Sequence, residues 1–478
     1  MEREMDELQR EIDAYRDEHW GEVLADIEAL VKVPSTEDLE AAAPGAPYGP
    51  GPRAALSVAL GIAERMGLST HDCEGHIGYA DLPGASDTQI GIIGHVDVVP
   101  AGPGWSVEPY AVTHRDGYLL GRGVIDDKGP ITVALHAVKF WKDRCAERGE
   151  RLPFTVRVLF GANEETDMKD VPYYRAHYDD PAFLFTPDSQ FPVGYGESGI
   201  CSGVLSSAVI ANGEIAEIGG GQAVNAVPGQ AWAVVRRSLD SLPDEWPEAI
   251  RLSEEPGSNG KLTRMEAQGV SAHASTPELG VNAIGVLVDF LLEAEIGTES
   301  ERAFLEALQR VHHHADGSGL NVACSDEHFG PLSVVGGVIS LSEGRLCQSL
   351  DFRYPTSITS DEISQRVNGT VTSMAPGCAF TLEHDKEPFL MNPDSPQVRA
   401  LLDAYCTVTG EEAQGMTSKG GTYARCFTAG VSFGVEKPWV KTPDWVGGMH
   451  GPDEGVSEDL LKEAFSIYAR ALGNLASQ

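Results

Sequence analysis

Residues 89–95 read Gln-Ile-Gly-Ile-Ile-Gly-His, and residues 130–143 read PITVALHAVKFWKD. The first stretch is a short apolar run bounded by turn residues, which is typical of a buried strand. The second carries its apolar residues on one face at helical spacing, so it predicts a helix. Two more apolar runs, at 154–160 and 182–185, predict further strands. Because strands that alternate with helices form largely parallel sheets covered on both faces, we predict an α/β domain.

The rest of the chain divides around this pattern. Residues 1–33 repeat apolar positions at helical spacing and predict one or two amphipathic helices. After residue 205 the sequence becomes rich in Gly and Ser, with short β-like pieces. We therefore expect an inserted α+β domain at 206–387. The first domain, begun at 1–205, would resume at 388–478 with a helix over 395–408.

Composition excludes several classes of function. The chain has 478 residues and a net charge of −37, from 35 Lys and Arg against 72 Asp and Glu. Such a surface repels phosphate backbones, so we expect no nucleic-acid partner. No apolar run is long enough to cross a membrane, and the charged N-terminus lacks the apolar core of a signal peptide. These features predict a cytoplasmic protein that does not bind membranes.

The eight cysteines and a histidine tract offer no metal site of their own. No two cysteines have the C-x-x-C spacing, which predicts scattered, reduced thiols. The tract His312-His313-His314 is interpreted as a solvated loop rather than a metal site.

Acidic residues and histidines follow several of the predicted strands, and others precede a helix or lie near the C-terminus. They are His95 and Asp97, Asp126 (which Asp127 follows), Glu164 and Glu165, Asp188, and His450. Each place has a simpler reading alone: a turn histidine with a capping Asp, a helix N-cap, or a solvated acidic turn. Together, and without Asp127, they supply two histidines and three carboxylates as ligands, with one Glu and one Asp to spare. That set suits two zinc ions that share a water molecule.

Two local spacings indicate roles within this set. Asp97 lies two residues after His95, so in an extended chain both side chains point the same way, and the carboxylate can accept the second imidazole N–H. Adjacent Glu164 and Glu165 point in opposite directions. One can bind a metal ion while the other acts as a general base.

The motifs, taken in order, resemble a known family. They are GHVDVVPAGPGW, GRGVIDDKGP, NEETD, TPDSQFPVGYGESGI, GVSAHASTPELGVNAI, DFRYP and GGTYAR. The chain is similar to the co-catalytic zinc exopeptidases, which include aminoacylase and carboxypeptidase G, and it most resembles their PepV/Sapep-like dipeptidase branch. The resemblance runs from about residue 15 to 475. It implies a catalytic domain with a mostly parallel, helix-covered sheet and an inserted α+β lid domain.

The resemblance also implies a role for each matching residue. The implied metal ligands are His95, Asp126, Glu165, Asp188 and His450. Asp126 would bridge both ions, with His95 and Asp188 on one ion and Glu165 and His450 on the other. Asp97 would orient His95, and Glu164 would be the general base. A cis peptide bond is implied between Asp126 and Asp127.

Other matching residues are implied to bind substrate. Asn225 and His273 would hold the carbonyl oxygen, and Arg353 would anchor a carboxylate, which suits a planar guanidinium. Gly421, Thr422 and Arg425, in GGTYAR, complete the set. Two departures from the branch put substrate preference in doubt. They are Ser198, where the branch has Lys, and Lys419, where it has a third Gly.

These expectations combine into a function. We predict a metal-dependent dipeptidase that hydrolyses dipeptides or short peptides with a metal-bridged water and a glutamate base. The cofactors would be two divalent cations, zinc first, with manganese or cobalt as alternatives. An N-acyl-amino-acid deacylase, or another aminohydrolase of this two-metal type, is the alternative, and a metal-binding module without catalysis is a third reading. The resemblance implies that an insertion of this length holds a second lobe in place of a partner's lid, so we expect a monomer rather than a dimer.

Overall fold

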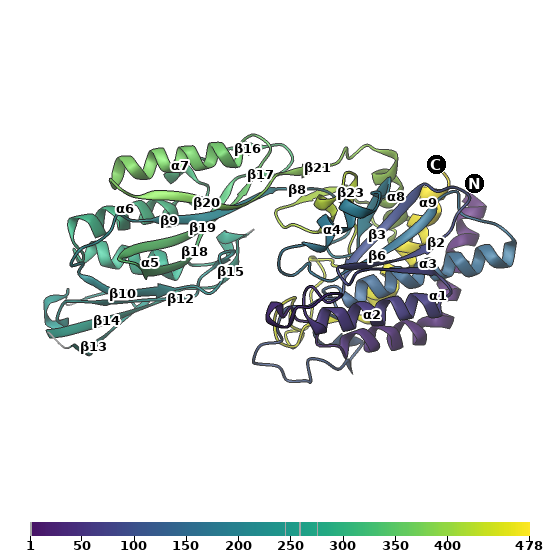
Figure 1. Ribbon diagram of the computed structural model, residues 1–478, viewed down its shortest axis with the longest axis horizontal. Helices are drawn as coiled ribbons and strands as arrows, with labels where there is room; N and C mark the ends of the chain where they lie inside the picture. Colours follow the sequence, from purple (N-terminus) through teal and green to yellow (C-terminus); the bar gives the residue numbers. More distant parts are fainter. Residues whose placement is uncertain (1, 244, 258–259, 275) are drawn as a thin grey trace. The chain divides into compact units, whose positions relative to one another are not determined.

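The computed structural model describes residues 2–243, 245–257, 260–274 and 276–478 and divides the chain into two compact units (Figure 1). The first unit comprises Met1–Gly196, Leu390–Met416 and Gly421–Gln478. The inserted unit comprises Glu197–Phe389 and Thr417–Gly420. Each unit has its own apolar core.

A nine-stranded sheet forms the centre of the first unit, in the order β1-β2-β6-β3-β7-β23-β8-β21, with β22 paired to β8. Its strands are β1 (Ser69–Cys73), β2 (Ile77–Leu82), β3 (Gln89–His95), β6 (Thr155–Gly161), β7 (Phe183–Thr186), β8 (Gly194–Glu197), β21 (Phe389–Leu390), β22 (Met416–Ser418) and β23 (Gly430–Ser432). The three strands predicted from apolar runs are β3, β6 and β7. Strands β6, β3, β7 and β23 run parallel, whereas β1, β2 and β8 pair antiparallel. The parallel arrangement therefore holds for the middle of the sheet.

Helices on this sheet bury the apolar faces seen in the sequence. They are α1 (Glu2–Val31), α2 (Pro50–Arg65), α3 (Lys128–Arg148), α4 (Asp170–His177), α8 (Pro396–Thr409) and α9 (Glu458–Ala476). Within residues 1–33, where one or two helices were predicted, Glu2–Val31 form one long helix. Buried Lys128 joins two of these helices, because its Nζ donates to the carbonyl oxygens of Leu30 (3.0 Å) and Val33 (2.8 Å) at the end of α1. This contact caps α1 and holds the start of α3 beside it.

The inserted unit is built on an antiparallel sheet of eight strands, in the order β13-β14-β12-β10-β18-β19-β9-β20. The strands are β9 (Gly199–Ser206), β10 (Ile215–Gly220), β12 (Gln230–Val235), β13 (Ile250–Gly257), β14 (Gly260–Gln268), β18 (Ser333–Ser342), β19 (Arg345–Tyr354) and β20 (Ala379–Lys386). Helices α5 (Ala283–Glu293), α6 (Glu299–His313) and α7 (Ser360–Met374) pack on it. Two small two-stranded sheets pair β11 (Ala226–Val227) with β15 (Ala272–His273) and β16 (Ser325–Asp326) with β17 (Gly330–Pro331). A three-stranded sheet joins β24 (Gly455–Ser457), β5 (Tyr118–Leu120) and β4 (Thr113–Arg115) in that order.

The division between units differs in detail from the predicted borders at 205/206 and 387/388. Strand β9 lies before residue 206 but pairs with β19 and β20, so it belongs to the inserted sheet. The short segment Thr417–Gly420 also belongs there, although it lies in the predicted second part of the first domain. Strand pairing between residues far apart in the chain sets these borders, and no local change of composition marks them.

The prediction of a solvated loop at the histidine tract is wrong for two of its residues. His312 and His313 form the last turn of α6, which extends this far because Leu308 and Val311 remain buried. His313 pairs with Asp289 at 2.8 Å, while His314 caps the helix and is exposed.

Two predictions from composition can be compared with the structure. All eight cysteines are free, as expected of reduced thiols. Within the residues that the structure describes, none of the helices combines the length and the apolar composition that crossing a membrane requires.

Candidate metal centre

The predicted acidic residues and histidines gather where parallel strands end. His95 ends β3, Glu164 and Glu165 follow β6, and Asp188 follows β7. These strands are parallel neighbours, so their carboxyl ends share one edge of the sheet, where open α/β sheets bind ligands. Two other segments complete the group: the residues just before α3 carry Asp126, and the loop before β24 carries His450.

Asp126 lies between the two histidines. Its Oδ1 is 2.9 Å from His95 Nε2, and its Oδ2 is 3.0 Å from His450 Nε2. His450 Nε2 is also 2.9 Å from Glu165 Oε2, and His95 Nε2 is 3.7 Å from Asp188 Oδ2. One carboxylate thus faces two separate clusters, with His95 and Asp188 on one side and His450 and Glu165 on the other.

Ligand atoms close enough to share a metal ion occur in two overlapping groups. His95, Glu164 and Asp188 form one, and His95, Asp126 and Glu165 form the other. Imidazole nitrogens and carboxylate oxygens are the donors that zinc, manganese and cobalt accept. The chemistry of the donor set therefore fits two divalent cations.

Asp97 lies close to His95 but contacts it differently from the prediction. His95 Nδ1 is 3.0 Å from the backbone carbonyl oxygen of Asp97, and 3.5 Å from its carboxylate. The carboxylate also accepts the backbone amides of Glu164 (3.2 Å) and Glu165 (3.1 Å). A carbonyl can only accept, so His95 carries its proton on Nδ1 and turns the Nε2 lone pair toward the cluster.

Asp127 is joined to Asp126 by a cis peptide bond, as the resemblance implies. It occupies the N-cap position of α3 but its side chain makes no capping hydrogen bond, so the simple helix-cap reading does not apply. Its Oδ2 accepts the His95 amide at 3.1 Å. No described residue donates a hydrogen bond to its buried Oδ1. A buried carboxylate oxygen without a donor indicates a missing positive charge nearby.

The pKa values of the cluster also indicate a missing positive charge. Burial, and then the charge of Asp126, raise the pKa of Asp188 to about 8. Burial and Asp188 also raise the pKa of Glu164 well above its usual range. Burial opposes ionisation of Asp126, but hydrogen bonds from His450 and His95 outweigh it and lower that pKa. Negative charge is therefore in excess here, and divalent cations would lower the raised pKa values of Asp188 and Glu164.

Arg122 and Glu454 were not predicted as site residues, yet they hold two of the loops that carry the cluster. Glu454 Oε1 accepts the amides of Gly123 (2.9 Å) and Ile125 (3.2 Å), just before Asp126. Arg122 donates to the carbonyl oxygen of His450 at 3.2 Å. Glu454 lies four residues after His450, but an acidic residue after a Pro-Asp turn gives no local sign of burial.

The predicted substrate residues of the inserted unit have less defined surroundings. The Arg353 guanidinium is buried against Asp351 (Nε to Oδ1, 2.7 Å) and donates to the Lys419 carbonyl oxygen at 3.2 Å. Asp351 was not predicted. Asn225 is exposed, and its carbonyl oxygen accepts the Ala274 amide at 3.0 Å. The backbone of His273 pairs with Ala226, while the His273 side chain lies outside the described part of the chain.

The GGTYAR segment lies in the first unit from Gly421 onward. Thr422 caps a short helical turn (Tyr423–Cys426) by accepting the Ala424 amide at 3.1 Å, and Gly421 and Arg425 are half-buried. The two departures from the branch make ordinary contacts within the inserted unit. Lys419 Nζ donates to the Pro331 carbonyl oxygen at 3.1 Å, and the Ser198 amide donates to that of Ser418 at 2.8 Å.

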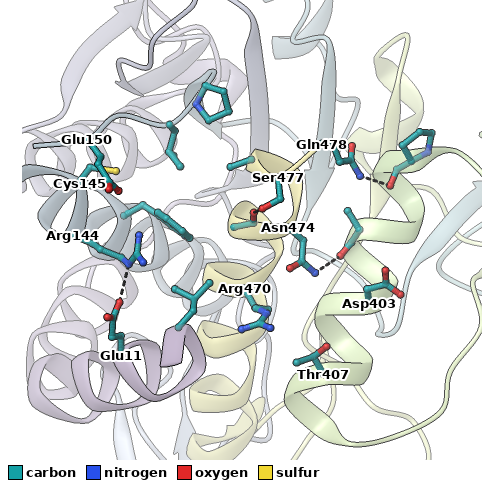
Figure 2. A pocket seen from close by; sticks show the side chains of 18 of the residues that line it. Glu11, Arg144, Cys145, Glu150, Asp403, Thr407, Arg470, Asn474, Ser477 and Gln478 are labelled. Atoms are coloured by element: carbon teal, nitrogen blue, oxygen red, sulfur yellow. Dashed lines mark hydrogen bonds and ion pairs between the residues drawn. The ribbon is translucent and has the colours of Figure 1, made fainter. Parts of the chain in front are cut away.

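A larger cavity of the first unit lies away from this cluster. It measures about 1300 Å³, and residues of α1, α3, α8 and α9 contribute to its lining. Figure 2 shows Arg470 at its centre, with Glu11 and Arg144 on one side and Asp403 and Thr407 on the other. Its arginines lie among acidic residues, as in the 2.8 Å pair of Arg144 with Glu11, and no histidine lines it. Size alone therefore does not identify the functional site, because the convergent polar groups lie at the sheet edge.

Known proteins resemble this chain over nearly its full length. Residues 91–474 match the family described as Peptidase family M20/M25/M40. The chain is 31% identical over 468 residues to "Putative dipeptidase YtjP" of Bacillus subtilis (strain 168), covering 95% of this chain and 97% of that protein. It is 30% identical over 473 residues to "Beta-Ala-Xaa dipeptidase" of Lactobacillus delbrueckii subsp. lactis, covering 95% and 96%. The crystal structure of human carnosine dipeptidase 1 shares the fold, with a TM-score of 0.57 at 15% identity over 98% of this chain and 99% of that one.

Proposed function

The chain belongs to the peptidase family M20/M25/M40, and on that premise we propose that it is a metal-dependent dipeptidase acting on dipeptides or very short peptides. The relatives named as dipeptidases cover almost the whole chain, which favours this reading over deacylation of N-acyl amino acids. The observation that carries the proposal is Asp126, whose two carboxylate oxygens each face a different histidine at about 3 Å. A carboxylate in that position is suited to bridging two cations.

We propose that His95, Asp126, Glu165, Asp188 and His450 hold two divalent cations, zinc in the first instance. Bound there, the cations would lower the pKa of a water molecule and polarise the peptide carbonyl. Glu164 lies in the same cluster as His95 and Asp188, so its carboxylate is within reach of that water. Glu164 takes the water's proton and passes it to the leaving amine. Asp97 holds the Glu164–Glu165 turn through two backbone amides, which keeps the base in place.

Substrate binding is assigned to both units. In this proposal Asn225 and His273 donate to the carbonyl oxygen as it gains negative charge. Arg353 binds the terminal carboxylate of the substrate, for which its guanidinium has the right geometry. Asp351 fixes that guanidinium from one side. Gly421, Thr422 and Arg425 line the approach of the substrate backbone.

The assembly and location of the enzyme are also proposals. The inserted unit contains an eight-stranded sheet with its own core, which is enough for a self-contained lid, so we propose a monomer. The eight free thiols suit a reducing compartment, and we place the reaction in the cytoplasm.

Metal removal tests the function. Dialysis against a chelator should abolish hydrolysis of a dipeptide panel, and addition of zinc, manganese or cobalt should restore it. Elemental analysis should find two equivalents of metal in the restored protein. Full activity in protein shown to be metal-free would sink the proposal.

A further inference from the structure

A second cavity of the first unit opens beside the metal centre. It measures about 600 Å³. Ile125, Gln190 and Gly448 line it, and each lies within two residues of a proposed ligand: Asp126, Asp188 and His450, respectively. Three separate segments of the centre therefore form one wall of the cavity.

Glu436 also lines this cavity, and it has no part in the mechanism so far. Its backbone bridges to Gln190 and donates to the Ser189 carbonyl oxygen at 3.1 Å, which places it next to the Asp188 segment. None of the described residues forms a hydrogen bond or ion pair with its carboxylate. Burial, and then the charge of Asp126, raise the pKa of Glu436 to about 7. A half-buried carboxylate in this position is stabilised by a cation.

The other charged groups that line the cavity do not supply that cation. Lys437 Nζ is held by Glu463 at 2.6 Å and by Glu411 at 3.3 Å. Glu463 and Asp459 line the cavity as further carboxylates. The cavity thus carries an excess of negative charge, and the backbone of Glu436 contacts the segment that follows Asp188.

Part of the remaining lining is apolar. Val446, Val456 and Leu460 contribute branched side chains, and Val440 adds another near the surface, where it is 52% exposed. An apolar cavity of this size takes up an aliphatic side chain with a gain of about 25 cal/mol per Å² of apolar area buried. The cavity therefore suits a ligand with an ammonium group at one end and an apolar side chain.

We infer that this cavity receives the amino-terminal residue of the substrate, with its α-ammonium group paired to Glu436 and its side chain against Val456 and Leu460. The inference rests on the proposed function, because the scissile carbonyl must lie at the metal centre. In a dipeptide the ammonium is two bonds from that carbonyl, so a carboxylate beside the centre is within its reach. Glu436 then selects a free amine over an acylated one.

Paired substrates that differ only in the amine test this role. Leucyl-alanine should be hydrolysed with a much higher kcat/KM than 4-methylpentanoyl-alanine, the same molecule without the α-amino group. Glu436→Gln should lower kcat/KM for leucyl-alanine by about tenfold or more, mainly through KM, since a charge-assisted pair is lost. The value for 4-methylpentanoyl-alanine should change less than about threefold. Asp459→Asn, which removes another carboxylate of the cavity, should leave unchanged the ratio of kcat/KM for leucyl-alanine to kcat/KM for 4-methylpentanoyl-alanine.

The side-chain part of the inference has its own variant. Val440→Trp adds volume at a surface position and should lower kcat/KM for leucyl-alanine relative to glycyl-alanine. Val209→Trp makes the same exchange at an exposed valine of the inserted unit, 62% exposed, and should not alter that ratio.

Several outcomes would overturn the inference. Equal losses on the amine and des-amino substrates in Glu436→Gln, with or without loss of metal, would assign Glu436 to the centre itself. An unchanged leucyl to glycyl ratio in Val440→Trp would exclude the cavity as the side-chain site. If the wild type hydrolyses no dipeptide, the proposed function fails, but the cavity can still be tested by calorimetry. Leucine is then expected to bind about tenfold more weakly to Glu436→Gln than to the wild type, and equal binding would refute the assignment of the cavity.

Discussion

Arg122 and Glu454 form an ion pair of 2.5 Å in the interior of the first unit, at 1% and 0% side-chain exposure. Glu454 holds the backbone that leads into Asp126, and Arg122 holds the carbonyl oxygen of His450. The pair therefore links the proposed bridging ligand to a ligand from a distant part of the chain. The pair contacts the loops that carry Asp126 and His450. Arg122 and Glu454 are therefore positioning residues.

Loss of this pair should weaken metal binding. We expect Glu454→Gln to bind zinc about 10–100-fold more weakly, the range typical for partners that orient ligands. The amide keeps the size of the side chain but loses its charge, so Arg122 is left buried without a carboxylate. Competition with a chromophoric chelator measures the affinity. Glu383→Gln, on an exposed position of β20, is the control. Unchanged affinity together with an unchanged melting temperature would contradict the assignment.

Removal of the proposed base should separate metal binding from turnover. Glu164→Ala is expected to retain two equivalents of metal and to lose at least about 10²–10⁴-fold in kcat, as general-base removal typically costs. The loss should exceed that range if Glu164 also delivers the proton to the amine. Elemental analysis and steady-state kinetics on one preparation give both values. A variant that keeps more than about a tenth of the wild-type rate would reject Glu164 as the base.

His312 should make the inserted unit less stable in acid. Burial lowers the pKa of His312 to about 4, against the pull of Asp289 and a contact with Gln348, while neighbouring His313 lowers it further. The unfolded chain then binds a proton on His312 more readily than the folded chain does. The contribution of neutral His312 to the free energy of unfolding is therefore present above about pH 6.5 and is lost as the pH falls toward 4. The loss is on the order of 2 kcal/mol, allowing for partial exposure.

Urea denaturation of wild type and His312→Gln between pH 4 and 7 measures this contribution. The difference in unfolding free energy between the two should shrink or change sign at low pH. His314→Gln, at the exposed helix cap, should track the wild type throughout. A constant difference across the range would show that His312 does not titrate as argued.

A mixing experiment tests whether each chain completes its own site. Glu164→Ala and His273→Ala should each be inactive, and their mixture should stay inactive if His273 serves the centre of its own chain. Sedimentation at the assay concentration should give the mass of a monomer. Recovery of activity on mixing would instead show that subunits share the histidine, and the monomer proposal would fall.

Local patterns predicted the core of the first unit well. Apolar runs bounded by turn residues became β3, β6 and β7, and the helical repeats became α1, α3 and α8. Those signals depend on side-chain periodicity, which the backbone geometry of a strand or helix imposes directly. The borders of the inserted unit were less predictable, since β9 joins its sheet by pairing with residues far along the chain.

The candidate site was likewise predictable from the sequence only in part. His95, Asp126, Glu165, Asp188 and His450 were named from residue type, motif order and a family resemblance, and the structure brings them together. Asp97 lies beside His95 but also accepts the amides of Glu164 and Glu165, a contact that the spacing of Asp97 and His95 does not indicate. Arg122, Glu436 and Glu454 gave no sequence signal, since their importance lies in what they contact.

The sequence by itself determined which side chains are available for chemistry and that several of them follow strands. Both properties are local, set by residue type and by the alternation of strands and helices. Tertiary structure alone decided that Asp126 lies between His95 and His450, that Asp97 also holds the Glu164–Glu165 turn, and that Glu436 borders a cavity. Those contacts join segments far apart in the chain, and their geometry depends on loop conformation and packing, which no local periodicity encodes.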